Sequence, residues 1–159
     1  MKLFELKFWS VVFLSGKPRK SYIILAMAAS SCFLKEIDPN SCGRSRNMKG
    51  LVLLCDCRDD ISWHLASFRL SKSNLNECDL ILARVGMFDV SLEEKKQFLV
   101  CPYHRHKYGQ FWRPSKVTCQ YPLHKGKSKT LKGTDVVTLQ MAKDIYTLYG
   151  STIPIGSCK

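Results

Sequence analysis

Apolar residues between 51 and 100 recur mainly at the spacing of amphipathic helices. Ile61, Leu65 and Phe68 share one helical face. The acidic pair Asp59-Asp60 precedes them and can cap the start of that helix. The pattern therefore predicts a short helix around these residues.

Two further helices are predicted in this stretch. One begins at Ser73 or Asn74 and ends before Gly86. The other opens with Ser91-Leu-Glu-Glu94, a capping-box pattern in which Ser and Glu side chains bond to free backbone N–H groups. We expect it to end near Val100, next to the first of the cysteines discussed below.

The end of the chain predicts another helix. Thr138 can cap a helix that runs through Tyr149, and Gly150 suits the position after its last turn. Residues 134–138 fit a short strand, and Leu51–Leu54 fits either a strand or a helix. The expected fold class is mostly α, with a small α+β arrangement possible.

Cysteine and histidine are concentrated just after this helical region. Two residues lie between Cys101 and His104, and four lie between Cys119 and His124, which gives C-x2-H-x14-C-x4-H. Structural zinc is held by four sulfur or nitrogen ligands in a tetrahedron. The spacing predicts a zinc site from these four residues, with His106 as a rival ligand; the alternative is buried cysteines and surface histidines without metal.

The other cysteines are less informative. A single residue between two ligands is uncommon in zinc sites, so Cys55 and Cys57 are not expected to bind metal. Cys158 could be a fifth ligand or half of a further pair. Ordinary buried or surface thiols are expected at the remaining positions, Cys32, Cys42 and Cys78.

Positive charge is concentrated in the same region as the zinc motif. The net charge is +12, and residues 95–134 contain ten Lys or Arg and no Asp or Glu. Clustered positive charge of this kind attracts polyanions, of which nucleic acids are the commonest. The sequence predicts DNA or RNA binding by Arg105, Lys107, Arg113, Lys116, Lys125 and Lys127.

Two properties of the motif argue against an enzyme. Four protein ligands leave zinc no open position for water or substrate. The chain also lacks a Walker A loop and the G-x-G-x-x-G, H-E-x-x-H and G-x-S-x-G motifs. We expect a non-catalytic, zinc-stabilised nucleic-acid-binding protein with no evident small-molecule substrate. The alternative is a zinc-scaffolded module that binds an acidic protein surface.

The chain is expected to divide into four segments. These are an apolar and basic N-terminal segment at 1–50, a helical core at 51–100, the zinc-binding basic module at 101–133, and a C-terminal helix and tail at 134–159.

The first thirty residues leave the compartment open. Residues 1–29 hold two short apolar runs, and neither approaches the roughly 20 residues that span a bilayer. The second run partly fits a signal peptide, which would make the protein secreted and disulfide-linked. We favour an intracellular, nuclear or cytoplasmic protein, because disulfides do not explain the histidines beside Cys101 and Cys119. Met27 is an alternative start.

Overall fold

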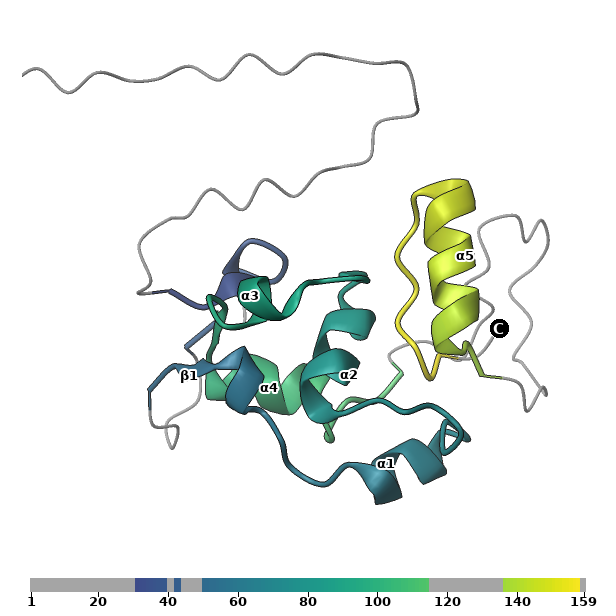
Figure 1. Ribbon diagram of the computed structural model, residues 1–159, viewed down its shortest axis with the longest axis horizontal. Coiled ribbons are helices and arrows are strands. Elements are labelled where there is room, and N and C mark those ends of the chain that lie inside the picture. The colour runs from purple at the N-terminus through teal and green to yellow at the C-terminus, as the bar shows by residue number, and fades with distance from the viewer. Residues whose placement is uncertain (1–30, 40–41, 44–49, 115–135, 158–159) are drawn as a thin grey trace, which may run out of the picture.

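Short helices and one two-stranded sheet make up the part of the chain that the computed structural model describes, residues 31–39, 42–43, 50–114 and 136–157, and the sheet lies at the side of the molecule away from the last helix (Figure 1). The two strands pair antiparallel, with Val52 opposite Val100. This arrangement agrees with the mostly α prediction and with its allowance for a small sheet. The elements in chain order are η1 (Phe33–Lys35), β1 (Val52–Leu53), η2 (Leu54–Asp56), α1 (Ser62–Ser67), α2 (Glu77–Arg84), α3 (Leu92–Lys95), β2 (Leu99–Val100), α4 (Pro102–Tyr108) and α5 (Leu139–Tyr149).

Local capping signals mark two helix starts where the sequence predicts them. At α5, the Thr138 side chain accepts a hydrogen bond from the Met141 N–H, and Gly150 adopts a left-handed conformation with φ 64° at the other end. At α3, Ser91 and Glu94 form both hydrogen bonds of a capping box. Side-chain chemistry within a few residues therefore fixes these boundaries.

Tertiary pairing changes two other predictions. The helix that begins after Ser91 ends at Lys95, because residues 99–100 pair with β1 as strand β2. The Leu51–Leu54 run forms β1 and then enters a 3-10 turn, whose Leu54 N–H donates to the Phe98 carbonyl. Helix α2 begins at Glu77, later than expected, with Asn76 as its capping residue.

Helix α2 contributes residues to two apolar cores, and all of its residues except Asp79 are buried. The cysteine-side core contains Cys32, Leu34, Leu54, Cys57, Cys78, Ile81, Leu82, Val85, Phe98, Val100 and Cys101. The α5-side core contains Ile61, Leu65, Leu70, Leu80, Ala83, Val137, Ala142, Ile145, Ile153 and Ile155.

Two arginines fix helix α4 against α2. The Arg84 guanidinium, which is buried, donates to the carbonyls of Tyr108 and Gly109 at the end of α4. It also lies 4.4 Å from the centre of the Trp112 ring. From α4, Arg105 donates two hydrogen bonds of 2.7 Å to the buried carboxylate of Glu77. These contacts set the position of the helix that carries the site below.

None of the helices in the described ranges is long and apolar enough to cross a membrane. Residues 1–30, on which the signal-peptide and Met27 alternatives depend, lie outside those ranges. The division into four segments stays a prediction.

Candidate metal centre

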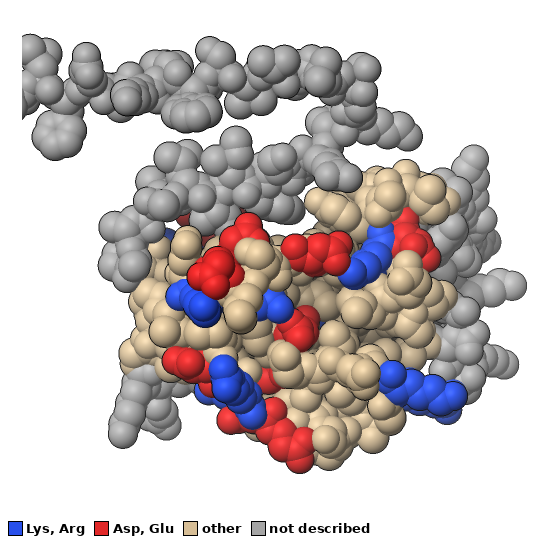
Figure 2. Space-filling model, viewed as in Figure 1, with Lys and Arg blue, Asp and Glu red and all other residues tan. Residues whose placement is uncertain are grey.

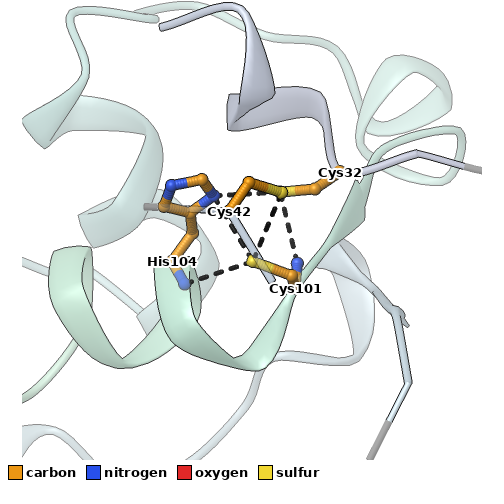
Figure 3. Close-up of side chains that lie close together, drawn as sticks. All are labelled: Cys32, Cys42, Cys101 and His104. Atoms are coloured by element: carbon orange, nitrogen blue, oxygen red, sulfur yellow. Dashed lines mark hydrogen bonds between the residues drawn. The ribbon is translucent and has the colours of Figure 1, made fainter. Parts of the chain in front are cut away.

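Four side chains from distant parts of the sequence converge at the edge of the cysteine-side core (Figure 3). They are Cys32, Cys42, Cys101 and His104, and each offers one donor atom within 4.8 Å of the others. All except the partly exposed Cys42 are buried. This group could hold a metal ion.

The start of helix α4 positions two of these residues. Cys101 follows strand β2 and is the N-cap of α4, and its Sγ accepts the His104 N–H at 3.4 Å. Pro102 occupies the first turn, where a missing N–H costs no hydrogen bond. Positions three apart in a helix share a face, so Cys101 and His104 point to the same place.

The other two residues come from the N-terminal side of the described chain. Cys32 is the N-cap of η1, and the Phe33 and Phe98 rings stack with centroids 4.9 Å apart, which holds η1 against strand β2. Cys42 lies in a turn in which Gly43 has φ 76°, a conformation that favours glycine.

The spacing of the donor atoms is compatible with a tetrahedral site. Zinc bonds of about 2.3 Å to sulfur and about 2.0–2.1 Å to nitrogen place two sulfurs about 3.8 Å apart and a sulfur and nitrogen about 3.5 Å apart. Cys42 Sγ and Cys101 Sγ are 3.9 Å apart. His104 Nδ1 lies 3.2 Å from Cys32 Sγ and 3.4 Å from Cys101 Sγ. Three of the six separations are therefore close to tetrahedral values, and the other three lie within 4.8 Å, so movement of the side chains can bring all four donors to one ion.

Burial and hydrogen bonding set the electrostatics of the cluster. Burial raises the pKa of Cys32 to about 12 and also raises the pKa of Cys42. Burial lowers the pKa of His104, and the nearby charge of Asp38 opposes that shift. Without metal these groups are therefore neutral thiols and a neutral imidazole. A metal ion has to displace the thiol protons, so its binding depends on pH.

Backbone N–H groups are ready to stabilise the thiolates that a metal would create. The Cys101 N–H donates to Cys32 Sγ at 3.3 Å, in addition to the His104 N–H that reaches Cys101. Hydrogen bonds to the charged form of a group favour that form. The donors for two of the three sulfurs are thus already in place.

Two of the four ligands expected from sequence are in the cluster. Cys101 and His104 meet there, whereas Cys119 and His124 lie outside the described residues. His106, the rival ligand, is two positions beyond His104 and therefore about 200° around the helix axis. Its exposed ring stacks on Phe111, with centroids 3.9 Å apart.

Sequence reasoning missed Cys32 and Cys42, which were expected to be ordinary thiols. Nine residues separate them, a longer interval than a typical ligand pair, and the Cys42-Gly43 turn was the only local signal. Among the described residues, no second group of three or more donors gathers around the other cysteines. Cys57 and Cys78 are buried thiols, and Cys158 lies outside the described residues.

The predicted nucleic-acid contacts have different surroundings. Arg105 pairs with Glu77 and with Asp59 at 2.9 Å, and Lys107 pairs with Asp38. Arg113 is exposed and donates to the carbonyl of Trp112, its neighbour in the chain. The remaining candidates lie outside the described residues: Lys116, Lys125 and Lys127.

Comparison with protein-family models, with curated proteins and with solved structures finds no match to this chain.

Proposed function

We propose that the chain is a zinc-stabilised, non-catalytic protein that binds nucleic acid. The observation that carries the zinc assignment is the convergence of three sulfurs and one imidazole nitrogen within 4.8 Å of one another, with three of the six separations close to those of a tetrahedral zinc site. Thiolates select soft or borderline metals over Mg²⁺ and Ca²⁺, and Cys3His is a common ligand set for structural zinc.

A structural role follows from the number of ligands. Four protein donors complete a tetrahedron and leave no position for water or substrate. The cluster also ties η1 and the Cys42 turn to helix α4, across sequence separations of 59 to 72 residues. Binding free energy in such a site is folding free energy.

The metal content of purified variants tests this assignment. We expect one zinc ion per wild-type chain, lost in Cys32→Ser and in Cys42→Ser. Cys78→Ser is the matched control, because it removes a buried thiol of the same core that lies outside the cluster. Zinc that persists in both ligand variants but is lost in Cys119→Ser or His124→Ala would favour the quartet predicted from sequence instead.

The nucleic-acid part of the proposal depends on where the net charge lies. The described residues carry eleven Lys or Arg and eleven Asp or Glu, so the excess of +12 belongs to the rest of the chain. On the face seen in Figure 2, basic and acidic side chains are intermixed. Residues 115–134 contribute five lysines and no acid. We infer that phosphate contacts come mainly from this basic segment and from Arg113 beside it.

Salt-dependent binding to a duplex DNA and to a single-stranded RNA tests this inference. Replacing Arg113 and Lys116 by Ala should weaken binding and reduce the log–log salt slope on duplex DNA by about 2. The matched control is the Lys96→Ala and Lys143→Ala double variant, which removes the same charge from lysines paired with Glu93 and Asp89.

Equal losses in the two double variants would mean that net charge alone drives binding. No loss in either would remove this surface from the proposal. Strong binding to an acidic protein, with a shallow salt dependence, would support the alternative partner.

A further inference from the structure

The imidazole of His104 has a second polar neighbour on the side away from the sulfurs. Its Nδ1 faces Cys32 and Cys101, whereas its Nε2 lies 3.7 Å from a carboxylate oxygen of Asp38. The His104 side chain is fully buried, and its Nε2 makes no hydrogen bond of standard geometry; besides the carboxylate, the backbone carbonyl of Asp38 lies near this nitrogen and also raises the pKa of the ring. Burying a ring N–H without an acceptor costs free energy, so we expect an acceptor at this position.

The Asp38 carboxylate is itself held in place. Its side chain is 16% exposed, and the same oxygen that faces His104 accepts a hydrogen bond from the Tyr108 hydroxyl at 3.3 Å. Lys107 forms an ion pair with that oxygen. Lys107 and Tyr108 belong to the helix that carries His104, so the carboxylate is fixed relative to the ring it faces.

We propose that Asp38 is the positioning residue of the metal centre. Its carboxylate accepts a hydrogen bond from Nε2–H of His104, and this leaves Nδ1 of the same ring as the ligand atom. This inference rests on the proposed metal site. When Nδ1 bonds to a metal, the neutral ring carries its proton on Nε2. A small rotation of the ring then brings the 3.7 Å separation to a hydrogen bond of about 2.9 Å. Carboxylate partners of this kind orient the ligand ring and raise its basicity.

Zinc affinity, measured by competition with a chelator on the full chain, tests the role of Asp38. Asp38→Asn should weaken zinc binding about 10–100-fold. The matched control is Asp89→Asn, the same substitution at an exposed carboxylate that pairs with Lys143 away from the cluster. The control should bind zinc within about twofold of wild type.

A second measurement separates positioning from a general effect on folding. Side-chain ¹⁵N NMR of the zinc-loaded wild type should show His104 with a metal-bound Nδ1 and a protonated Nε2. If Asp38→Asn fails to fold, Tyr108→Phe decides, because it removes only the hydroxyl that holds the carboxylate. It should weaken zinc binding by several fold.

Three results would overturn the inference: a metal-bound Nε2, unchanged zinc affinity in Asp38→Asn, or equal losses in Asp38→Asn and Asp89→Asn. If Asp38→Asn does not fold, unchanged affinity in Tyr108→Phe has the same meaning. A wild-type chain that binds no zinc would instead overturn the proposed function.

Discussion

The two cores to which helix α2 contributes are built in different ways. The α5-side core is aliphatic and contains no cysteine, and the regular helix α5 supplies two of its residues, Ala142 and Ile145. The cysteine-side core is assembled from a two-stranded sheet, 3-10 turns, the eight-residue helix α2 and the start of the seven-residue helix α4. Helices this short are marginal on their own.

The cores also differ in what holds their segments together. Around α5, apolar contacts and backbone hydrogen bonds such as Val137 N–H to Ser157 carbonyl join the segments. On the other side, η1 and the Cys42 turn meet α4 at the four-donor cluster. Stability can therefore be unevenly distributed within one small protein. One side is held by aliphatic packing, and the other, on our proposal, by a metal ion.

The largest expected effect is on the cysteine side. Cys101→Ser removes a proposed ligand, and structural zinc contributes on the order of 10–16 kcal/mol in small fingers. The Leu54 N–H donates to the Phe98 carbonyl. We expect its hydrogen exchange to become at least tenfold faster, which corresponds to a decrease of about 1.4 kcal/mol in the free energy of local opening. Hydrogen exchange with mass spectrometry checks this at Leu54 and, as a reporter of the other core, at Gly156.

The Gly156 amide bonds to the Val137 carbonyl and should change by less than about threefold in the same experiment. Cys78→Ser provides the control for loss of a buried thiol. If Cys101→Ser speeds hydrogen exchange equally at both amides, the two cores unfold as one cooperative unit and do not differ in stability as described above.

A substitution in the α5-side core should have the opposite selectivity. Ile145 is buried there, so Ile145→Ala should lower the free energy of unfolding by about 2–5 kcal/mol. Zinc content should stay at the wild-type value, because the residue is not part of the cluster. Urea denaturation and elemental analysis measure the two quantities.

Leu148→Ala is the control on the same helix. Its side chain is 65% exposed, so the substitution should change the free energy of unfolding by less than about 0.5 kcal/mol. Loss of zinc from Ile145→Ala would show that the metal centre depends on the remote core.

A third effect, which depends on pH, is expected on the α1 side. Burial, with a contribution from Arg84, lowers the pKa of His64 to about 4, whereas an unfolded histidine titrates near 6.5. The unfolded chain therefore binds more protons between these values, and stability falls as the pH falls through this window. The loss that His64 causes should reach about 2 kcal/mol at pH 5.

Urea denaturation of wild type and His64→Gln at pH 7 and pH 5 measures this loss. His64 is not a ligand in the cluster, so proton-driven release of zinc acts on both proteins and cancels in their difference. An identical decrease in the two proteins would mean that acid acts only on the cysteine side.

Sequence patterns predicted features whose cause is local. Thr138 and Gly150 bound α5, and Ser91 with Glu94 starts α3, because each signal involves groups within a few residues. The Cys101 and His104 pair was likewise identified from its spacing, which places both side chains on one face of α4. Such features can be predicted without considering the rest of the chain.

Features created by long-range contact were not predictable in this way. Cys32 and Cys42 reach the cluster across 59 residues or more, and the only local sign near them is the glycine that follows Cys42. The run of positive charge after Lys95 likewise looked unopposed in sequence. In the fold, Arg105 pairs with Glu77, 28 residues earlier in the chain, and Lys107 pairs with Asp38, 69 residues earlier.

The separation between the two halves of the cluster has a consequence for biosynthesis. Cys42 is translated 59 residues before Cys101, which takes about 3–12 s at about 5–20 residues per second. During that interval the early sulfurs have left the ribosome without their partners. On our proposal, the four ligands are all present only after residue 104 has been made, so the complete metal site forms late in the synthesis of the chain.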